Sequence, residues 1–142
     1  MKSKILIFCT GNSCRSQMAE GFLKSFNNEI EVYSAGTNPE KRINPLTVKV
    51  MSEVGINISL NKPKNVNLFV EKIFDYVITV CDNAKESCPI FLGKIGETIH
   101  IGFDDPAEAK GSDEEILFEY RRIRDLIFKE FNEFYKNYLM KE

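Results

Sequence analysis

The sequence lacks a long hydrophobic run. Its first apolar stretch, residues 5–8, has four residues and gives way to small and polar ones. A membrane-spanning helix needs about 20 apolar residues, and the core of a secretory signal needs roughly 7 to 15. We therefore expect a cytoplasmic protein without a membrane partner.

An excess of positive charge is also missing. The chain has 19 Lys and Arg residues against 21 Asp and Glu residues, a net charge of −2, whereas nucleic-acid binding usually needs a positive field. We expect no polynucleotide partner. The 142 residues show no repeat, low-complexity tract or interdomain linker, so we expect one domain spanning residues 1–142, and a monomer.

Histidine is scarce. His100 is the only one in the sequence, and it falls inside a predicted strand. The cysteine spacings CTGNSC and CDNAKESC have four and six intervening residues, and the second exceeds the roughly two to four residues that usually separate the paired ligands of a zinc site. A zinc site is therefore disfavoured, and His100 is expected to be structural or at the surface. In a reducing compartment, catalytic or redox-active thiols are expected rather than standing disulfides. The four cysteines are Cys9, Cys14, Cys81 and Cys88.

Strand-like apolar runs alternate with amphipathic helical patterns along the chain. This alternation predicts an α/β fold, a parallel sheet with helices on its faces. A helix is expected to begin near Ser16, and another runs from the cap Asn44 to Gly55, with Leu46, Val50 and Val54 on one face. The strands are expected at residues 5–8, 31–34, 76–80 and 98–101.

The last helix has the clearest pattern. Ser112 and Glu115 form a capping-box motif, and apolar residues then recur at spacings of three and four, as on one buried helix face. This stripe is expected to be core packing. Its members are Ile116, Tyr120, Ile123, Ile127, Phe131, Phe134 and Tyr138.

Cys9 follows the first strand, where ligands of open α/β sheets bind. Small, turn-prone residues then let backbone N–H groups surround an anion at the start of a helix. Arg15 can hold two oxygens of a tetrahedral oxyanion, and a Ser16 hydroxyl can support a Cys9 thiolate. Cys9 is thus the expected nucleophile, and Cys14 is expected to pack. The expected substrate-binding residues are Thr10, Gly11, Asn12, Ser13, Cys14 and Arg15.

Two further groups complete the candidate site. Asp104 and Asp105 follow a predicted strand and precede a proline. Either this pair provides a proton donor, or both carboxylates are solvated in an Asp-Pro turn. Cys81 ends a strand at the same sheet edge as Cys9, and Cys88 follows a polar stretch that could rearrange. This layout is that of a thiol relay.

The segment CTGNSCRSQMAEG resembles the signature loop of thioredoxin-coupled arsenate reductases, which share the fold of low-molecular-weight protein tyrosine phosphatases. The resemblance continues through VYSAGT, NPLTVKVMSEVGINIS, VITVCDNAKESCP and GFDDPAEAKGS. It implies a four-stranded parallel sheet with flanking helices. It also implies that Cys9 is the nucleophile, Arg15 the oxyanion clamp and Asp105 the acid, with Asp104 outside the chemistry.

The resemblance further implies how the reaction proceeds. Cys9 displaces an oxygen of arsenate, Cys81 attacks Cys9 and releases arsenite, and Cys88 attacks Cys81. Reduced thioredoxin then reopens the Cys81 to Cys88 disulfide, so electrons come from thioredoxin and no cofactor is tightly bound. Arsenate and phosphate are the expected oxyanions.

Some members of the family bind potassium beside the loop. The matching residues here are Asn12, Glu20 and Ser34, but a fourth ligand, an acid, falls near Lys64. Potassium binding is therefore in doubt: either the site is lost or the lysine ammonium occupies it.

Two other functions stay open. A low-molecular-weight phosphotyrosine phosphatase would use Cys9, Arg15 and Asp105 in the same way, although that family usually has an aromatic residue where Ala107 follows the Asp-Pro pair. A non-catalytic oxyanion-binding or redox-sensing module would keep the loop without needing an acid.

Overall fold

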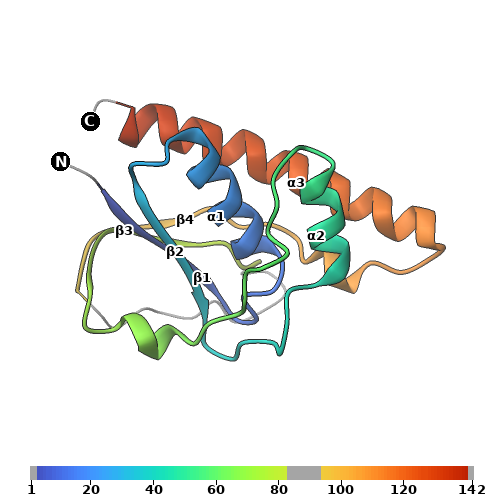
Figure 1. The fold of residues 1–142 in the computed structure, drawn as a ribbon, viewed down its shortest axis with the longest axis horizontal. Coiled ribbons are helices and arrows are strands. Elements are labelled where there is room, and N and C mark those ends of the chain that lie inside the picture. Colours follow the sequence, from blue (N-terminus) through green and yellow to red (C-terminus); the bar gives the residue numbers. More distant parts are fainter. Residues whose placement is uncertain (1–2, 83–93, 141–142) are drawn as a thin grey trace.

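The computed structural model describes residues 3–82 and 94–140 (Figure 1). Four parallel strands form one sheet in the order β2-β1-β3-β4. The strands are β1 (Lys4–Cys9), β2 (Glu31–Gly36), β3 (Ile73–Thr79) and β4 (Lys94–His100). The predicted four-stranded parallel sheet is confirmed, and each strand contains most or all of its predicted run.

In the part of the chain that the structure describes, three α-helices lie on one face of the sheet. They are α1 (Arg15–Phe26), α2 (Pro45–Ser52) and α3 (Asp113–Phe134), and α3 continues into a π-helical turn at Tyr135–Leu139. Short 3-10 helices lie at η1 (Val66–Phe69) and η2 (Pro106–Glu108). Figure 1 shows α1 and α3 lying along the same side of the strands.

Strand β1 separates two cores because its side chains alternate between the sheet faces. Ile5 and Ile7 pack with the three helices, in one large apolar cluster. Leu6 and Phe8 point to the other face and pack with Phe69 of η1. Strand β1 is thereby buried on both faces, and its carboxyl end has a fixed position.

The predicted helix caps are confirmed. Asn44 Oδ1 accepts from the Leu46 N–H at 2.9 Å. The Ser112 hydroxyl accepts from the Glu115 N–H, and the Ser112 N–H donates to Glu115 Oε1, both at 3.1 Å. These bonds satisfy N–H groups that the first helical turn leaves without partners.

The structure corrects the end of the second predicted helix and one core position of the last one. Val54 is 44% exposed, because α2 ends at Ser52 and Gly55 takes a left-handed φ of +82°. Tyr138 is 43% exposed and Leu139 is buried instead. The π-helical turn explains this second difference, since its wider winding shifts which residues face the core.

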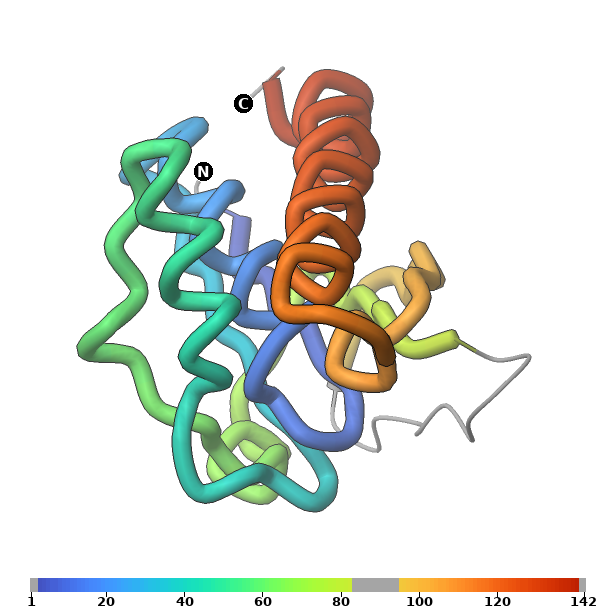
Figure 2. The backbone as a smooth tube through the Cα atoms, turned by 90° about the vertical axis from the view of Figure 1, so that its right-hand side faces the viewer, coloured from blue at the N-terminus to red at the C-terminus, as the bar shows by residue number. Residues whose placement is uncertain are grey.

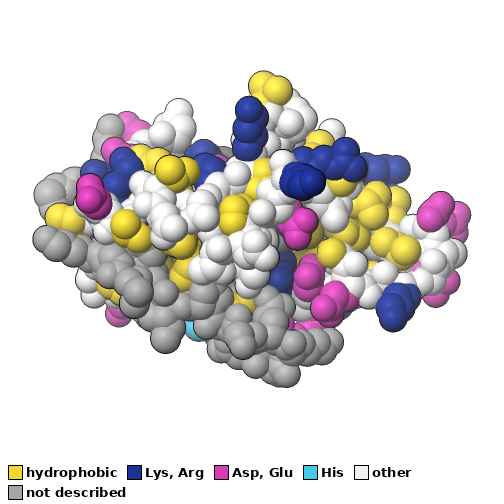
Figure 3. All heavy atoms as spheres, turned by 90° about the horizontal axis from the view of Figure 1, so that it is seen from below, with side chains coloured by type: hydrophobic (Ala, Val, Ile, Leu, Met, Phe, Trp, Pro, Cys, Tyr) yellow, Lys and Arg dark blue, Asp and Glu magenta, His cyan; other side chains and the backbone are white. Residues whose placement is uncertain are grey.

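Within residues 3–82 and 94–140, no helix has the length and apolarity that crossing a bilayer requires. Figure 3 shows acidic and basic side chains interspersed on the face seen from below. His100 ends β4 and is exposed, with Nδ1 2.7 Å from Thr79 Oγ1.

Candidate active site

The loop between β1 and α1 lies at the carboxyl edge of the sheet. It borders a cavity of about 680 Å³. Its lining also includes Asn38, Glu40, Lys41 and Arg42 from the segment after β2, and Asp105 from the segment that precedes α3. Figure 2 shows the blue loop after β1 close to the orange segment before α3. The cavity therefore brings residues from three parts of the chain to one place.

The carbonyl groups of the loop are all engaged in hydrogen bonds with other parts of the protein. All five carbonyl oxygens of residues 9–13 accept hydrogen bonds from outside the loop, at 2.9 to 3.2 Å. We infer that the N–H groups are thereby left on the cavity side, where they can bind an anion. The donors are the N–H groups of Thr37, Asn38, Glu40 and Asn44 and the side-chain amide of Gln17.

Helix α1 adds to this anion site. Among the described residues, its N-cap Cys14 makes no side-chain capping bond. The N–H groups of the first turn are then available to an anion, and the positive end of the helix dipole points the same way.

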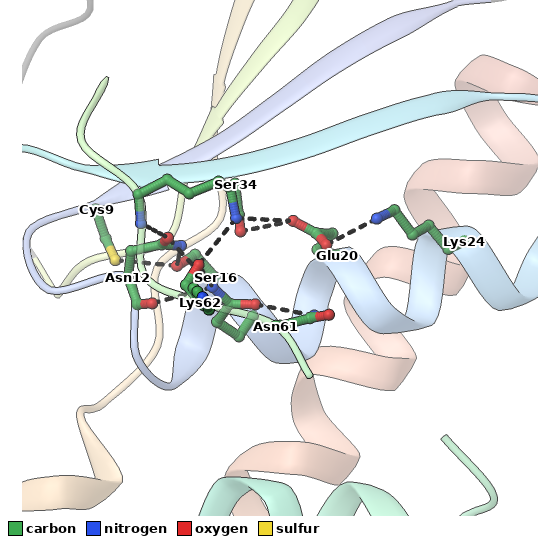
Figure 4. A network of polar contacts seen from close by, with 10 residues as sticks. Cys9, Asn12, Ser16, Glu20, Lys24, Ser34, Asn61 and Lys62 are labelled. Atoms are coloured by element: carbon green, nitrogen blue, oxygen red, sulfur yellow. Dashed lines mark hydrogen bonds and ion pairs between the residues drawn. The ribbon is translucent and has the colours of Figure 1, made fainter. Parts of the chain in front are cut away.

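Cys9 ends β1 and is 3% exposed. Its sulfur lies 3.3 Å from Ser16 Oγ, which accepts a 2.8 Å hydrogen bond from Asn12 Nδ2. Because Asn12 already donates to this oxygen, the hydroxyl proton of Ser16 can be donated to a Cys9 thiolate. Figure 4 shows Cys9, Asn12 and Ser16 gathered in this way.

Arg15 is almost fully buried, with 6% of its surface exposed. Its Nη1 donates to the Phe103 carbonyl at 3.0 Å, and its Nη2 lies 3.7 Å from Asp105 Oδ2. The guanidinium is thus anchored to the segment that carries the candidate acid. A planar fork fixed in this way can present two N–H groups to one oxyanion.

The two aspartates differ in their surroundings. Asp105 lines the cavity, and its Oδ1 accepts from the Ala107 N–H at 3.0 Å as the cap of η2. Asp104 pairs at the surface with Arg122, at 3.3 Å. Of the two aspartates, Asp105 is therefore the one that lies at the cavity beside the loop.

Cys14 has surroundings that suit packing. It is 5% exposed, and its sulfur lies 2.8 Å from Thr47 Oγ1. Burial raises the pKa of the Cys14 thiol to about 12, so this thiol stays protonated at neutral pH. A thiol is far less nucleophilic than a thiolate.

Cys81 is fully buried and lies two residues beyond β3. The register pairs Phe8 with Thr79, so Cys9 and Cys81 follow neighbouring parallel strands to the same sheet edge. Both belong to the same apolar cluster. Cys88 lies outside the described residues.

Sequence reasoning did not predict the contacts that hold the loop from behind. Asn12 has a left-handed φ of 50°, a conformation that asparagine tolerates better than most residues. Its Oδ1 accepts from the Lys64 N–H at 2.8 Å and from Gln17 Nε2 at 3.2 Å. The turn-prone Asn12 was a usable signal, but nothing local in the sequence marks Gln17 or Lys64 as its partners.

Gly36, the last residue of β2, touches the loop directly. A Cβ atom there would collide with the Thr10 carbonyl oxygen and lie 2.9 Å from its carbon. We expect Gly36→Ala to displace the loop, lowering kcat/KM roughly 100-fold and the free energy of unfolding by about 1 to 3 kcal/mol. Steady-state kinetics and denaturant unfolding measure the two effects.

Gly96→Ala is the matched control, because its Cβ would lie 2.7 Å from the Asp75 carbonyl oxygen, in the β3–β4 pair. This variant should lose stability and keep its activity. Equal losses of activity in both variants would contradict a specific role for Gly36.

The implied potassium site does not fit the residues present. The Ser34 hydroxyl already donates to Glu20 Oε1 at 2.7 Å, and Lys24 Nζ lies 2.9 Å from Glu20 Oε2. A second ammonium, that of Lys64, lies 3.9 Å from Glu20 Oε1. Potassium prefers anionic and carbonyl oxygens, whereas here two ammonium groups already face the one carboxylate.

The chain was compared with known proteins. The family of low molecular weight phosphotyrosine protein phosphatases matches residues 4–142. The arsenate reductase of Shouchella clausii is 46% identical over 129 residues, covering 89% of this chain and 91% of that protein. The arsenate reductase of Bacillus subtilis is 43% identical over 136 residues, covering 94% and 96%.

Solved structures agree with this result. An arsenate reductase in its phosphate-binding state superposes with a TM-score of 0.78 at 30% identity, covering 96% of this chain and 98% of that one. A tyrosine phosphatase from Erwinia amylovora, 16% identical with a TM-score of 0.73 and coverage of 96% and 93%, shares the fold. The chain therefore belongs to the low molecular weight phosphotyrosine protein phosphatase family and, within it, groups with arsenate reductases.

Proposed function

We propose that this protein reduces arsenate to arsenite in the cytoplasm, with Cys9 as nucleophile, and that a thioredoxin returns it to the reduced state. The observation that carries the proposal is the pair of buried cysteines, Cys9 and Cys81, at one sheet edge beside an anion-binding loop. The names of the relatives support the same reaction.

Arsenate binds in the loop as a tetrahedral anion. The N–H groups of the loop and of the first turn of α1 surround its oxygens, and Arg15 holds two of them. Phosphate has the same shape and similar charge, so it binds in the same place and competes.

The first chemical step forms a sulfur–arsenic bond. The Cys9 thiolate attacks arsenic, and one arsenate oxygen departs as water after taking a proton from Asp105. Arsenic remains in the +5 state, because the thiolate replaces an oxygen ligand without changing the electron count.

The second step transfers two electrons. The Cys81 thiolate attacks the Cys9 sulfur, a sulfur–sulfur bond forms, and the sulfur–arsenic bond breaks with its electron pair going to arsenic. Arsenic leaves as arsenite in the +3 state. The two cysteine sulfurs together lose these two electrons and become the disulfide.

Resetting the enzyme needs an external dithiol. Cys88 attacks Cys81 and frees Cys9, and the thioredoxin dithiol then reduces the Cys81 to Cys88 disulfide. Since Cys88 lies outside the described residues, this step rests on the family resemblance and on the chemistry of thiol exchange.

A phosphatase would share the loop, Arg15 and Asp105 but would need no second cysteine, because water completes its cycle. The burial of Cys81 at the Cys9 edge favours the reductase. Ala107, a small residue, also lines the cavity after Pro106, so no aromatic side chain faces a substrate ring at this position.

The direct test measures arsenite formation with arsenate, thioredoxin, thioredoxin reductase and NADPH. We expect one NADPH oxidised for each arsenite formed, and competitive inhibition by phosphate. If NADPH oxidation does not depend on arsenate, while a small aryl phosphate is hydrolysed rapidly, the protein is a phosphatase.

Asp105→Asn should slow formation of the Cys9 adduct roughly 100-fold or more, the usual contribution of a general acid. Binding of phosphate should change little, because the substitution removes a proton source and no donor to the anion. Pre-steady-state kinetics and phosphate competition measure the two properties. Asp104→Asn is the control and should be nearly wild type; loss of phosphate binding in Asp105→Asn would instead assign Asp105 to binding.

A further inference from the structure

Glu20 is a buried carboxylate behind the Cys9 loop. It lies on α1 one turn beyond Ser16, and its side chain is 5% exposed. Figure 4 shows Glu20 between Ser34 and Lys24. A buried carboxylate is costly unless it is paired with positive charge, and on this face of α1 an unpaired one would also oppose the formation of a Cys9 thiolate.

Two lysines face Glu20 in different ways. Lys24 Nζ is 2.9 Å from Oε2, but its side chain is 53% exposed on the surface of α1. Lys64 Nζ is 3.9 Å from Oε1, and its side chain is 30% exposed. Water screens the more exposed Lys24 more than it screens Lys64, whereas the Lys24 pair is the shorter of the two.

Lys64 is also bonded to the loop itself. Its N–H donates to Asn12 Oδ1 and its carbonyl accepts from the Gly36 N–H, both at 2.8 Å. Its ammonium donates to the Lys62 carbonyl at 3.2 Å. The side chain of Lys64 therefore stabilises the conformation of residues 62–64, and the Lys64 N–H in this segment holds Asn12.

Asn12 transmits this support to the nucleophile. Its Nδ2 donates to Ser16 Oγ at 2.8 Å, and Ser16 Oγ lies 3.3 Å from Cys9 Sγ. A continuous series of contacts thus connects the Lys64 backbone to the reactive sulfur.

We propose that Lys64 is a positioning residue whose ammonium supplies, from within the chain, the positive charge that Glu20 needs behind the Cys9 loop, so that the enzyme needs no monovalent cation. The proposal deepens the proposed function, because it concerns the reactivity of the same thiol. It accounts for the misfit between this site and potassium.

The test follows the alkylation of Cys9 by iodoacetamide at neutral pH, which requires no arsenate chemistry. Mass spectrometry with peptide fragmentation distinguishes Cys9 from Cys14. Wild-type protein should react at the same rate in potassium chloride and in tetramethylammonium chloride of equal ionic strength. Lys64→Met should react about tenfold more slowly in both salts, as expected for loss of one charge-assisted contact.

Three further variants sharpen the test. Lys64→Arg retains the charge and should stay within about threefold of wild type. Lys64→Asp should react slowly in tetramethylammonium chloride, and potassium chloride should accelerate it severalfold. The new carboxylate would then face Glu20 beside the Ser34 hydroxyl, and these oxygens could bind a potassium ion. Lys24→Met removes the shorter ion pair and should stay within about twofold of wild type.

A wild-type rate that depends on potassium would overturn the proposal. So would a wild-type rate in Lys64→Met, an equal loss in Lys24→Met, or indifference of Lys64→Asp to potassium. Thermal melting checks that each variant is folded; if Lys64→Met is not, the wild-type salt comparison and Lys64→Arg still decide. Failure to reduce arsenate with these alkylation results intact would refute the proposed function and leave this inference standing.

Discussion

Cys9→Ser is expected to abolish arsenate reduction, with a loss of roughly 10⁴-fold or more. The serine hydroxyl stays protonated at neutral pH, and the donors around this position cannot convert it into an alkoxide. The protein should remain folded, because oxygen replaces sulfur at a site 3.3 Å from the Ser16 hydroxyl. Arsenite release under the coupled assay measures the effect.

Oxyanion binding should survive this substitution, since the N–H groups and Arg15 are untouched. Titration calorimetry with phosphate should give an affinity close to that of wild type. Cys14→Ala is the control for a loop cysteine: it should lose about 1 to 2 kcal/mol of stability through the Thr47 contact while keeping turnover. Appreciable turnover by Cys9→Ser would remove Cys9 from the mechanism.

Cys81→Ser is expected to release no arsenite while still hydrolysing a small aryl phosphate. The first reaction needs a thiol to break the sulfur–arsenic bond and accept the oxidation, whereas water completes the second. The variant separates the two halves of the chemistry, because Cys9, Arg15 and Asp105 are unchanged. Both activities are measured on the same preparation.

Cys88→Ser tests the next step of the relay, the attack of Cys88 on Cys81. It should form about one arsenite per protein and stop with Cys9 joined to Cys81, which non-reducing peptide mapping identifies. Wild type after one turnover without thioredoxin should carry the Cys81 to Cys88 disulfide. Free Cys81 and Cys88 thiols after arsenate has been consumed would contradict the relay.

Local patterns predicted the fold well. Apolar runs located the strands because each is buried, and the caps Asn44 and Ser112 located the helix starts because they act on N–H groups two or three residues away. The same local rules placed Tyr138 in the core, where the π-helical turn puts Leu139 instead. The side-chain pattern does not indicate where an α-helix changes to π-helical winding.

The sequence predicted the loop from neighbouring residues, and it predicted Cys81 and Asp105 from their places after strands and from the family resemblance, but it did not predict the backbone atoms that hold the loop. Cys9, Arg15 and Ser16 lie on one strand, loop and helix, and their spacing was informative. The Phe103 carbonyl that holds Arg15 is a backbone atom 88 positions away, and the Lys64 N–H on Asn12 is 52 positions away. Backbone partners of this kind depend on the tertiary fold and are independent of side-chain identity.

The hydrogen bonds accepted by the carbonyls of residues 9–13 have a consequence for binding. Their partners all lie in the protein, so these hydrogen bonds form without a bound anion. Such preorganisation avoids most of the entropy loss and reorientation that a flexible loop would incur on meeting its ligand. Oxyanions should therefore associate rapidly, and affinities for tetrahedral ions should follow their charge and size, with little contribution from conformational adjustment.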